Sequence, residues 1–322
     1  MKVIARILLL SFLLLAASCT REVFDEPLAG LPEGTPVTLN ISFGAQEALD
    51  VRIGTKAEMS RADESRVHDL YVLLFDREGK NFYGRYFTYE HRFQTLAALT
   101  ASTHEGWFVE NLQLSDKDES KTVKGVVKIS TVSKEGCTLV LLANISNTVT
   151  ALNGEDALDW LTTMVSKGDE FTLSDLKAVR VTLEQNIVNR ADLFLMLGKE
   201  SGLNTGAMAW DKTDGASTGT YGTDYKIPLQ RLDAKVKFRI KYDTTNIDGI
   251  TPRFWQACSV PSSCYLIERE ETQTSHDPDD ATFDTEEVYF EGTESDSDGV
   301  WQVFTFYMLE NRPEKKQTAS EY

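Results

Sequence analysis

The residue whose type and surroundings best fit a specific reaction is Cys19. It follows the small and apolar stretch Leu15–Ser18, and small residues that end in a cysteine fit the site of a lipoprotein signal peptidase. The thiol is the group that receives a diacylglycerol. We therefore predict cleavage before Cys19 and lipidation of its sulfur, with acyl chains such as palmitate holding the protein to an outer membrane.

The segment before this cysteine has the composition of a signal peptide. Lys2 and Arg6 precede an almost unbroken apolar run, Ile7–Ala17, which is too short to span a bilayer. The residues after the cysteine are polar, acidic and proline-bearing, as in a tether that cannot fold alone. The sequence thus predicts a signal peptide over residues 1–18 and an acylated linker over 19–35.

Ser217 lies in the pattern of a nucleophile elbow, Gly215-Ala-Ser217-Thr-Gly219. That motif works when a buried strand precedes the serine and a helix follows it. Here a polar stretch flanks the serine on both sides, which favours a flexible loop. We expect no catalytic residue and no enzymatic activity.

Metal and cofactor sites are not indicated either. The four histidines, His68, His91, His104 and His276, are scattered, and none has a second His or Cys at metal-ligand spacing. The sequence also has no Walker loop and no dinucleotide fingerprint. We expect neither a metal nor a cofactor.

The acidic tract Glu268–Asp298 has 13 carboxylates in 31 residues. Within it, Glu294–Gly299 imitates the start of a calcium loop, because alternate carboxylates followed by glycine can surround a hard cation. The position that should provide a bidentate carboxylate is Thr305 instead. The pattern therefore favours a solvated hairpin tip over a calcium site.

Three cysteines follow Cys19. Cys137 precedes an apolar run and is interpreted as a core residue. Cys258 and Cys264 flank a short loop that a disulfide could bridge, although spacing alone does not decide whether it forms. The pair is therefore kept as a candidate disulfide.

Composition limits the partners. The chain has 33 basic and 50 acidic residues, and removal of Lys2 and Arg6 with the signal peptide leaves a net charge of about −19. Such a charge excludes nucleic acid as an expected partner. The length after the signal peptide suits two ordinary domains.

The recurring unit along the chain is a short β-branched or aromatic run bounded by Gly, Asn, Asp or Ser, which is typical of antiparallel sandwiches. We predict an all-β fold with two tandem antiparallel β-sandwich domains of transthyretin-like or Greek-key type. Strands are expected at 37–43, 68–76, 82–89, 107–112, 123–132, 138–145, 194–198, 225–228, 232–242, 287–291 and 301–308.

The clearest helix is expected over Glu155–Lys167, where apolar residues recur at helical spacing and Gly168 follows. It is expected to cover one end of a sandwich.

Residues 199–224 are rich in Gly, Ser, Thr and Asp and predict a long surface loop. A new series of strands begins at Tyr225, so the domains are placed at 36–224 and 225–322. The second has few strands for a closed sandwich. It is therefore either cut short or leaves an open sheet.

Several of these segments, taken in order, resemble the fimbrillin superfamily of the Bacteroidetes, the FimA/Mfa-type subunits and anchors of type V pili. The matching segments are the lipobox, Val37–Phe43, Val67–Asp76 with Gly79, Leu139–Ser146, Ile227–Phe238 and Phe306–Arg312. The more specific residues among them are Arg231, Ala234, Lys235, Glu310, Asn311 and Arg312.

The resemblance implies assembly by strand addition. A trypsin-like protease cuts such subunits after a basic residue and releases the first strand, and a strand of the next subunit fills the groove. Here the loop after the first strand contains Arg52, Lys56, Arg61 and Arg66. The bond between Arg61 and Ala62 most resembles the family's cleavage point, while the alternative is an uncut loop, as in anchor subunits.

The sequence departs from the family pattern after Arg312, where the remaining residues are polar and poor in strand formers. Either the sequence is cut short or the subunit does not donate a strand. We therefore expect a fimbrillin-like pilus component, an anchor or accessory subunit on the cell surface or in a fimbrium, with other fimbrial subunits as partners. The alternative is a surface lipoprotein that binds a glycan or a host protein through loops around Trp210, Tyr221 and Trp255.

Overall fold

The structure is a computed structural model that describes residues 31–45, 65–110, 124–147, 150–183, 193–207, 226–241, 253–267, 282–289, 293–297 and 299–309. Several predictions concern residues outside these ranges. They are those for the signal peptide, Cys19, Arg61, Ala62, Ser217, Trp210, Tyr221, most of the acidic tract and the tail after Arg312.

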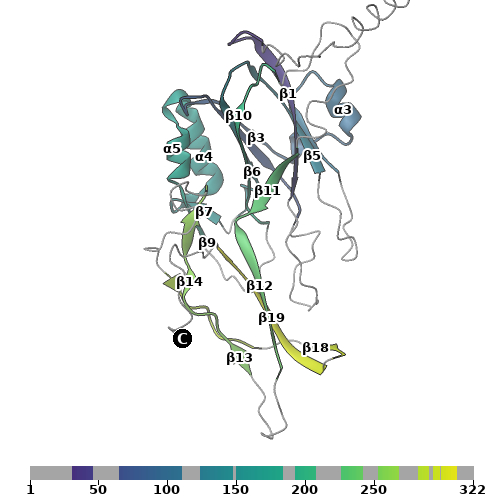
Figure 1. Ribbon diagram of the computed structural model, residues 1–322, viewed down its shortest axis with the longest axis vertical. Helices are drawn as coiled ribbons and strands as arrows, with labels where there is room; N and C mark the ends of the chain where they lie inside the picture. The colour runs from purple at the N-terminus through teal and green to yellow at the C-terminus, as the bar shows by residue number, and fades with distance from the viewer. Residues whose placement is uncertain are drawn as a thin grey trace, which may run out of the picture.

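Eight strands form the main sheet (Figure 1). In spatial order they are β3 (Asn81–Phe87), β2 (Leu70–Phe75), β6 (Cys137–Ala143), β10 (Met196–Leu203), β11 (Lys226–Arg231), β1 (Pro36–Ala45), β5 (Lys124–Val132) and β4 (Gly106–Val109). Strand β11 pairs with β10 through its last residues and with β1 through its first. Side chains from the two halves of the sheet meet in one core, which makes this part a β-sandwich.

The two middle strands β2 and β6 are buried on both faces. Leu70, Val72 and Leu74 of β2 point into the inner core between the two halves, while Tyr71 and Leu73 belong to a second core on the outer face. A strand that is apolar on both sides needs no polar alternation. The continuous apolar run at 68–76 therefore forms a central strand, as the sequence predicts.

The predicted helix is present as α4 (Ala157–Ser166). Asp156 begins it by accepting hydrogen bonds from Leu158 N and Asp159 N at 3.0 Å. Trp160 and Leu161 pack in the outer core, together with the following helix α5 (Leu173–Lys177). The helices thus cover a face of the sheet (Figure 1), and the expectation that α4 covers an end of the sandwich was wrong because its apolar side matches the outer apolar face of β2 and β6.

The remaining strands are shorter sheets. A three-stranded sheet has the order β12 (Asp233–Ile240), β19 (Gly299–Leu309) and β18 (Thr293–Asp296). Two-stranded pairs are β13 (Phe254–Trp255) with β17 (Val288–Tyr289) and β14 (Val260–Pro261) with β16 (Thr282–Phe283), and a four-stranded sheet has the order β15 (Ser263–Tyr265), β9 (Arg180–Leu183), β7 (Thr150–Leu152) and β8 (Glu155–Asp156). A short helix, α3 (Leu96–Ala101), lies outside the helical pair.

The described part of the chain is therefore mainly β-structure, as predicted, whereas the second of two tandem sandwiches stays a prediction. The strand that opens the predicted second domain lies in the first sandwich: Ile227 and Leu229 of β11 are in the inner core. Tyr307 of β19 reaches the same core, at 5.0 Å between ring centroids from Phe194. The domain division near residue 225 is thus crossed by core packing.

Candidate functional site

The candidate site is the position that β1 occupies in the sandwich. Nine residues of β1, Pro36–Gly44, pair antiparallel with Val132–Lys124 of β5. On its other side, Ser42–Ala45 pair parallel with Lys226–Leu229 of β11. The first strand of the described chain therefore lies inside the sheet between two strands that come much later in the sequence (Figure 1).

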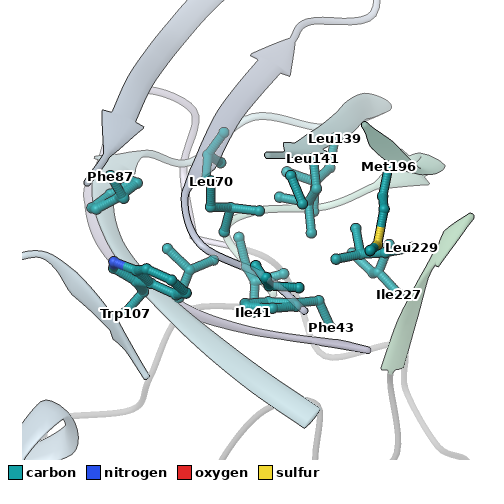
Figure 2. Packing of buried hydrophobic residues seen from close by; sticks show 14 of the residues in the cluster. Ile41, Phe43, Leu70, Phe87, Trp107, Leu139, Leu141, Met196, Ile227 and Leu229 are labelled. Carbon is teal, nitrogen blue, oxygen red and sulfur yellow. The ribbon is translucent and has the colours of Figure 1, made fainter. Parts of the chain in front are cut away.

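The side chains of β1 alternate between two environments. Val37, Leu39, Ile41 and Phe43 point inward and are between 1% and 5% exposed. Figure 2 shows Ile41 and Phe43 facing Leu70 and Leu139 across the core, with Ile227 and Leu229 beside them. Burial of four such side chains contributes about 1.5–3 kcal/mol each. The place of β1 is thus an apolar groove that the strand fills.

The wall formed by β5 is supported from its outer face. Lys128 Nζ donates hydrogen bonds to the carbonyl oxygens of Leu99 at 3.3 Å, Thr100 at 3.0 Å and Ser102, which are at the end of α3. An ammonium at the C-terminal end of a helix satisfies carbonyls that have no partner within the helix. These bonds therefore fix helix α3 to β5.

The segment that leads into β1 is held by one residue of the β5–β6 turn. Thr35 N donates to Ser133 Oγ at 3.0 Å, Ser133 N donates to Thr35 O at 2.8 Å, and Gly34 N donates to Ser133 O at 2.9 Å. These bonds fix the start of β1 to the sandwich, at the end opposite to Phe43 along the strand.

The chain that returns after the loop behind β1 is held by Asn144. This residue is fully buried, has a φ of 63° and follows the end of β6. Its side chain accepts a hydrogen bond from His68 N and donates to the carbonyl oxygens of Arg66 and Phe194, each at 2.8 Å. Asn144 therefore ties the segment after the loop to the strand ends of the sandwich.

Asp69 completes this polar cluster. Its carboxylate is 1% exposed, accepts a hydrogen bond from Ile145 N at 2.8 Å and a short one from Ser146 Oγ. Burial raises its pKa above the ordinary value, although the bonds from Ser146 and Ile145 act in the other direction. The sequence offered no reason to select Asn144 or Asp69 as a pair, because the two are far apart in the chain.

Among the basic residues of the loop after β1, Arg66 is the one that the structure describes. Its carbonyl oxygen accepts from Asn144, and the next residue, Val67, is 5% exposed. A protease needs an accessible segment that it can hold in an extended form. Arg66 itself is exposed, but its carbonyl bond and the buried Val67 hold the segment in place; Arg61 and Ala62 lie outside the described residues and stay candidates.

The candidate disulfide is not present. Cys258 and Cys264 are not joined in the structure. Cys264 lies on β15 and packs in the outer core, while Cys258 is exposed on the loop before that core. The Cys258 side chain is therefore exposed to solvent, whereas the Cys264 side chain is buried in the core. Cys137 is a core residue as predicted, and burial raises the pKa of its thiol to about 11.

The predicted histidines and acids form no ion site among the residues that the structure describes: these contain no group of three or more His, Cys, Asp or Glu that could hold a metal ion. His68 stacks on Tyr89 at 6.3 Å between ring centroids, and His91 Nδ1 lies 3.1 Å from Thr88 N. Both histidines thus have local structural contacts. In the same described part of the chain, no helix has the length and apolar character to cross a membrane.

The sequence matches no protein-family model and no curated protein. Its fold is similar to solved structures of fimbrial proteins from Bacteroidetes. A fimbrial assembly protein from Parabacteroides distasonis has 13% identity and a TM-score of 0.44 over 86% of this chain and 78% of that one. The fimbrial anchor protein Mfa2 from Porphyromonas gingivalis has 15% identity and a TM-score of 0.34 over 86% and 74%. At this identity and TM-score the likeness carries no argument about function, which is argued below from the residues.

Proposed function

We propose that this chain is a fimbrillin-like pilus component, an anchor or accessory subunit, that is exported as a lipoprotein and assembled by β-strand addition. The observation that supports the proposal is the central position of β1 between β5 and β11. Loss of a central strand would leave unpaired N–H and C=O groups on both neighbours and an apolar slot between them. An extended segment of another subunit satisfies both requirements.

The lipid on Cys19 decides between two versions of this function. If the chain stays uncut, β1 remains in its groove and the lipid anchors the whole molecule to the outer membrane. If the chain is cut after Arg61, the tether and β1 are no longer joined to the body, and the groove can accept another strand. No enzymatic step by this chain is part of the proposal.

The experiment that tests the proposal determines the N-terminus of the protein recovered from the cell surface, by mass spectrometry of the intact chain and of its first peptide. An acylated Cys19 identifies a retained anchor, and Ala62 identifies a processed subunit. An unmodified terminus at any other place, with no copurifying fimbrial subunit, would contradict both versions.

A second candidate function, the binding of a glycan, is favoured by a pair of exposed aromatic side chains. Phe254 and Tyr289 are direct partners in the β13–β17 pair and are 49% and 70% exposed. Trp255 points the other way and stacks on Phe304 at 4.5 Å between ring centroids, so it is not available to a ligand. Exposed aromatic rings can stack on apolar faces of sugar rings. The unchanged protein should then bind sugars on a glycan array, and the variants Phe254→Ala and Tyr289→Ala should lose this binding. Pilus assembly should not change in either variant.

A further inference from the structure

Gly125 of β5 lies under the ring of Phe43. The two residues are direct partners in the β1–β5 ladder. A Cβ atom built on Gly125 would lie 2.2 Å from Phe43 Cζ and 2.4 Å from Cε2, which is closer than carbon atoms approach. Phe43 is 1% exposed and packed in the inner core, so its ring has little space to move aside. The ring thus occupies the volume that a side chain at position 125 would need.

The other inward-facing positions of β5 carry side chains. Val127 is opposite Ile41, Ile129 is opposite Leu39, and both β5 residues are fully buried. On the far side of Gly125, Val109 of β4 is its direct partner. Between Val127 and Val109, the missing side chain of Gly125 leaves room for a planar ring at one end of the groove, whereas the neighbouring positions have room for aliphatic side chains.

We infer that Gly125 sets the register and the sequence preference of any strand held in this groove. The groove selects an extended segment of another subunit with three aliphatic residues at alternate positions followed, two residues later, by an aromatic one. The segment runs antiparallel to β5. The part of the inference that concerns strand exchange rests on the proposed function. The contact between Phe43 and Gly125 is present in the intact chain and does not depend on it.

Shifts of register are disfavoured for different reasons. A shift by one residue would turn Thr38, Asn40 and Ser42 into the apolar core, because neighbouring residues of a strand face opposite sides. A shift by two residues toward the start of the strand would place the ring against Val127, where the branched side chain fills the space. A ring at the last inward position therefore disfavours both of these shifts.

The test uses the full chain with the recognition site of a specific protease placed between residues 46 and 64. The chain is cut in place and then mixed with fluorescent peptides that correspond to residues 35–45. The unchanged peptide should enter the groove at least tenfold more tightly than a peptide with Phe43→Ala, and than one in which Ile41→Phe is combined with Phe43→Ile.

The matched variants are Gly125→Val, with Gly125→Ala as a milder change, and Ser130→Ala, whose side chain is exposed on the opposite face of β5. With Gly125→Val the preference should invert, so that the Phe43→Ala peptide binds more tightly than the unchanged one. Ser130→Ala should leave the order of the peptides as it is. Equal binding of all three peptides to the unchanged chain would overturn the inference.

Failure of strand exchange is a separate outcome. If no peptide enters any cut chain, the proposed function fails, and the uncut chain then decides about Gly125. Gly125→Ala should raise the unfolding equilibrium constant at least tenfold more in the presence of Phe43 than in a Phe43→Ala background, because the clash needs the ring. Equal effects in the two backgrounds would overturn the role of Gly125.

Discussion

At the scale of single residues, Asn144 joins parts of the molecule that strand patterns cannot relate. The sequence places it inside the predicted strand 138–145, because it follows an unbroken apolar run. In the structure it adopts a left-handed conformation and its side-chain amide makes three hydrogen bonds, of which the one to Phe194 O is buried and the other two are part-buried. Asn tolerates this conformation better than most residues. The segment that leaves the loop behind β1 is therefore positioned by a residue on another strand.

Asn144→Ala should destabilise the protein strongly. The change leaves the buried carbonyl of Phe194 without its partner, at a cost of about 1–3 kcal/mol, and also removes the part-buried bonds to His68 N and Arg66 O. Asn144→Gly is the control, because it keeps the left-handed backbone without the side chain. Urea unfolding should show a large loss in the free energy of unfolding for both variants, and Asn144→Ala should be the less stable of the two. A loss below about 1 kcal/mol for Asn144→Gly would contradict the role of the hydrogen bonds.

Asp69 makes stability depend on pH in a defined direction. Its pKa in the folded chain is raised above 3.8 by burial. Its contribution to stability is therefore complete below about pH 3.8 and is lost as the pH rises through the folded-state value. Asp69→Asn cannot ionise and keeps an oxygen that accepts from Ile145 N. In urea unfolding between about pH 3.5 and about pH 7, the stability of Asp69→Asn should rise relative to the unchanged protein as the pH rises. Parallel curves would contradict this.

At the scale of elements, β1 is the strand whose pattern and place agree most closely. The sequence predicts a half-buried strand at 37–43 from alternation alone, and the structure confirms it as β1. Alternation cannot reveal its neighbours, because β5 and β11 follow about 80 and 180 residues later in the chain. The same limit applies to α4: the helical spacing predicted the element, but the face it covers depends on β2 and β6.

Two neighbouring residues of β1 offer a direct check of its orientation. Ile41 is 3% exposed and points into the inner core, while Ser42 points outward. Ile41→Ala should cost about 2–5 kcal/mol, because it removes buried methyl groups and leaves a cavity. Ser42→Ala should change stability by no more than about 0.5 kcal/mol. Thermal and urea unfolding measure both. Similar losses would mean that β1 does not lie in the groove as described.

At the scale of the whole molecule, the two cores draw on both ends of the described chain. The inner core contains residues from Val37 to Tyr307, and the outer core extends to Leu309. The sequence could place a boundary near residue 225 because the composition changes there. Composition does not predict which later strands pack against the first sandwich. The candidate disulfide is a similar case, since spacing in the sequence says nothing about the directions of Cys258 and Cys264.

Because the cores are shared, the first sandwich should not fold as residues 36–224. Such a fragment lacks side chains from both cores, namely Ile227, Leu229, Cys264, Leu266, Ile267, Tyr307 and Leu309. Each missing side chain removes about 1.5–3 kcal/mol of burial, and the total is comparable to the whole stability of a typical domain. Circular dichroism and calorimetry should find no cooperative transition for the fragment.

A matched pair of substitutions in the full chain separates loss of the shared core from damage by truncation. Ile227 is 4% exposed in the inner core, and Gln230 of the same strand is exposed. Ile227→Asp places a charge in an apolar core and should abolish the unfolding transition of the first sandwich, while Gln230→Asp should leave it in place. If residues 36–224 instead unfold cooperatively at the temperature of the full chain, the division near residue 225 separates two independent domains, and β11 contributes to the first one without being required by it.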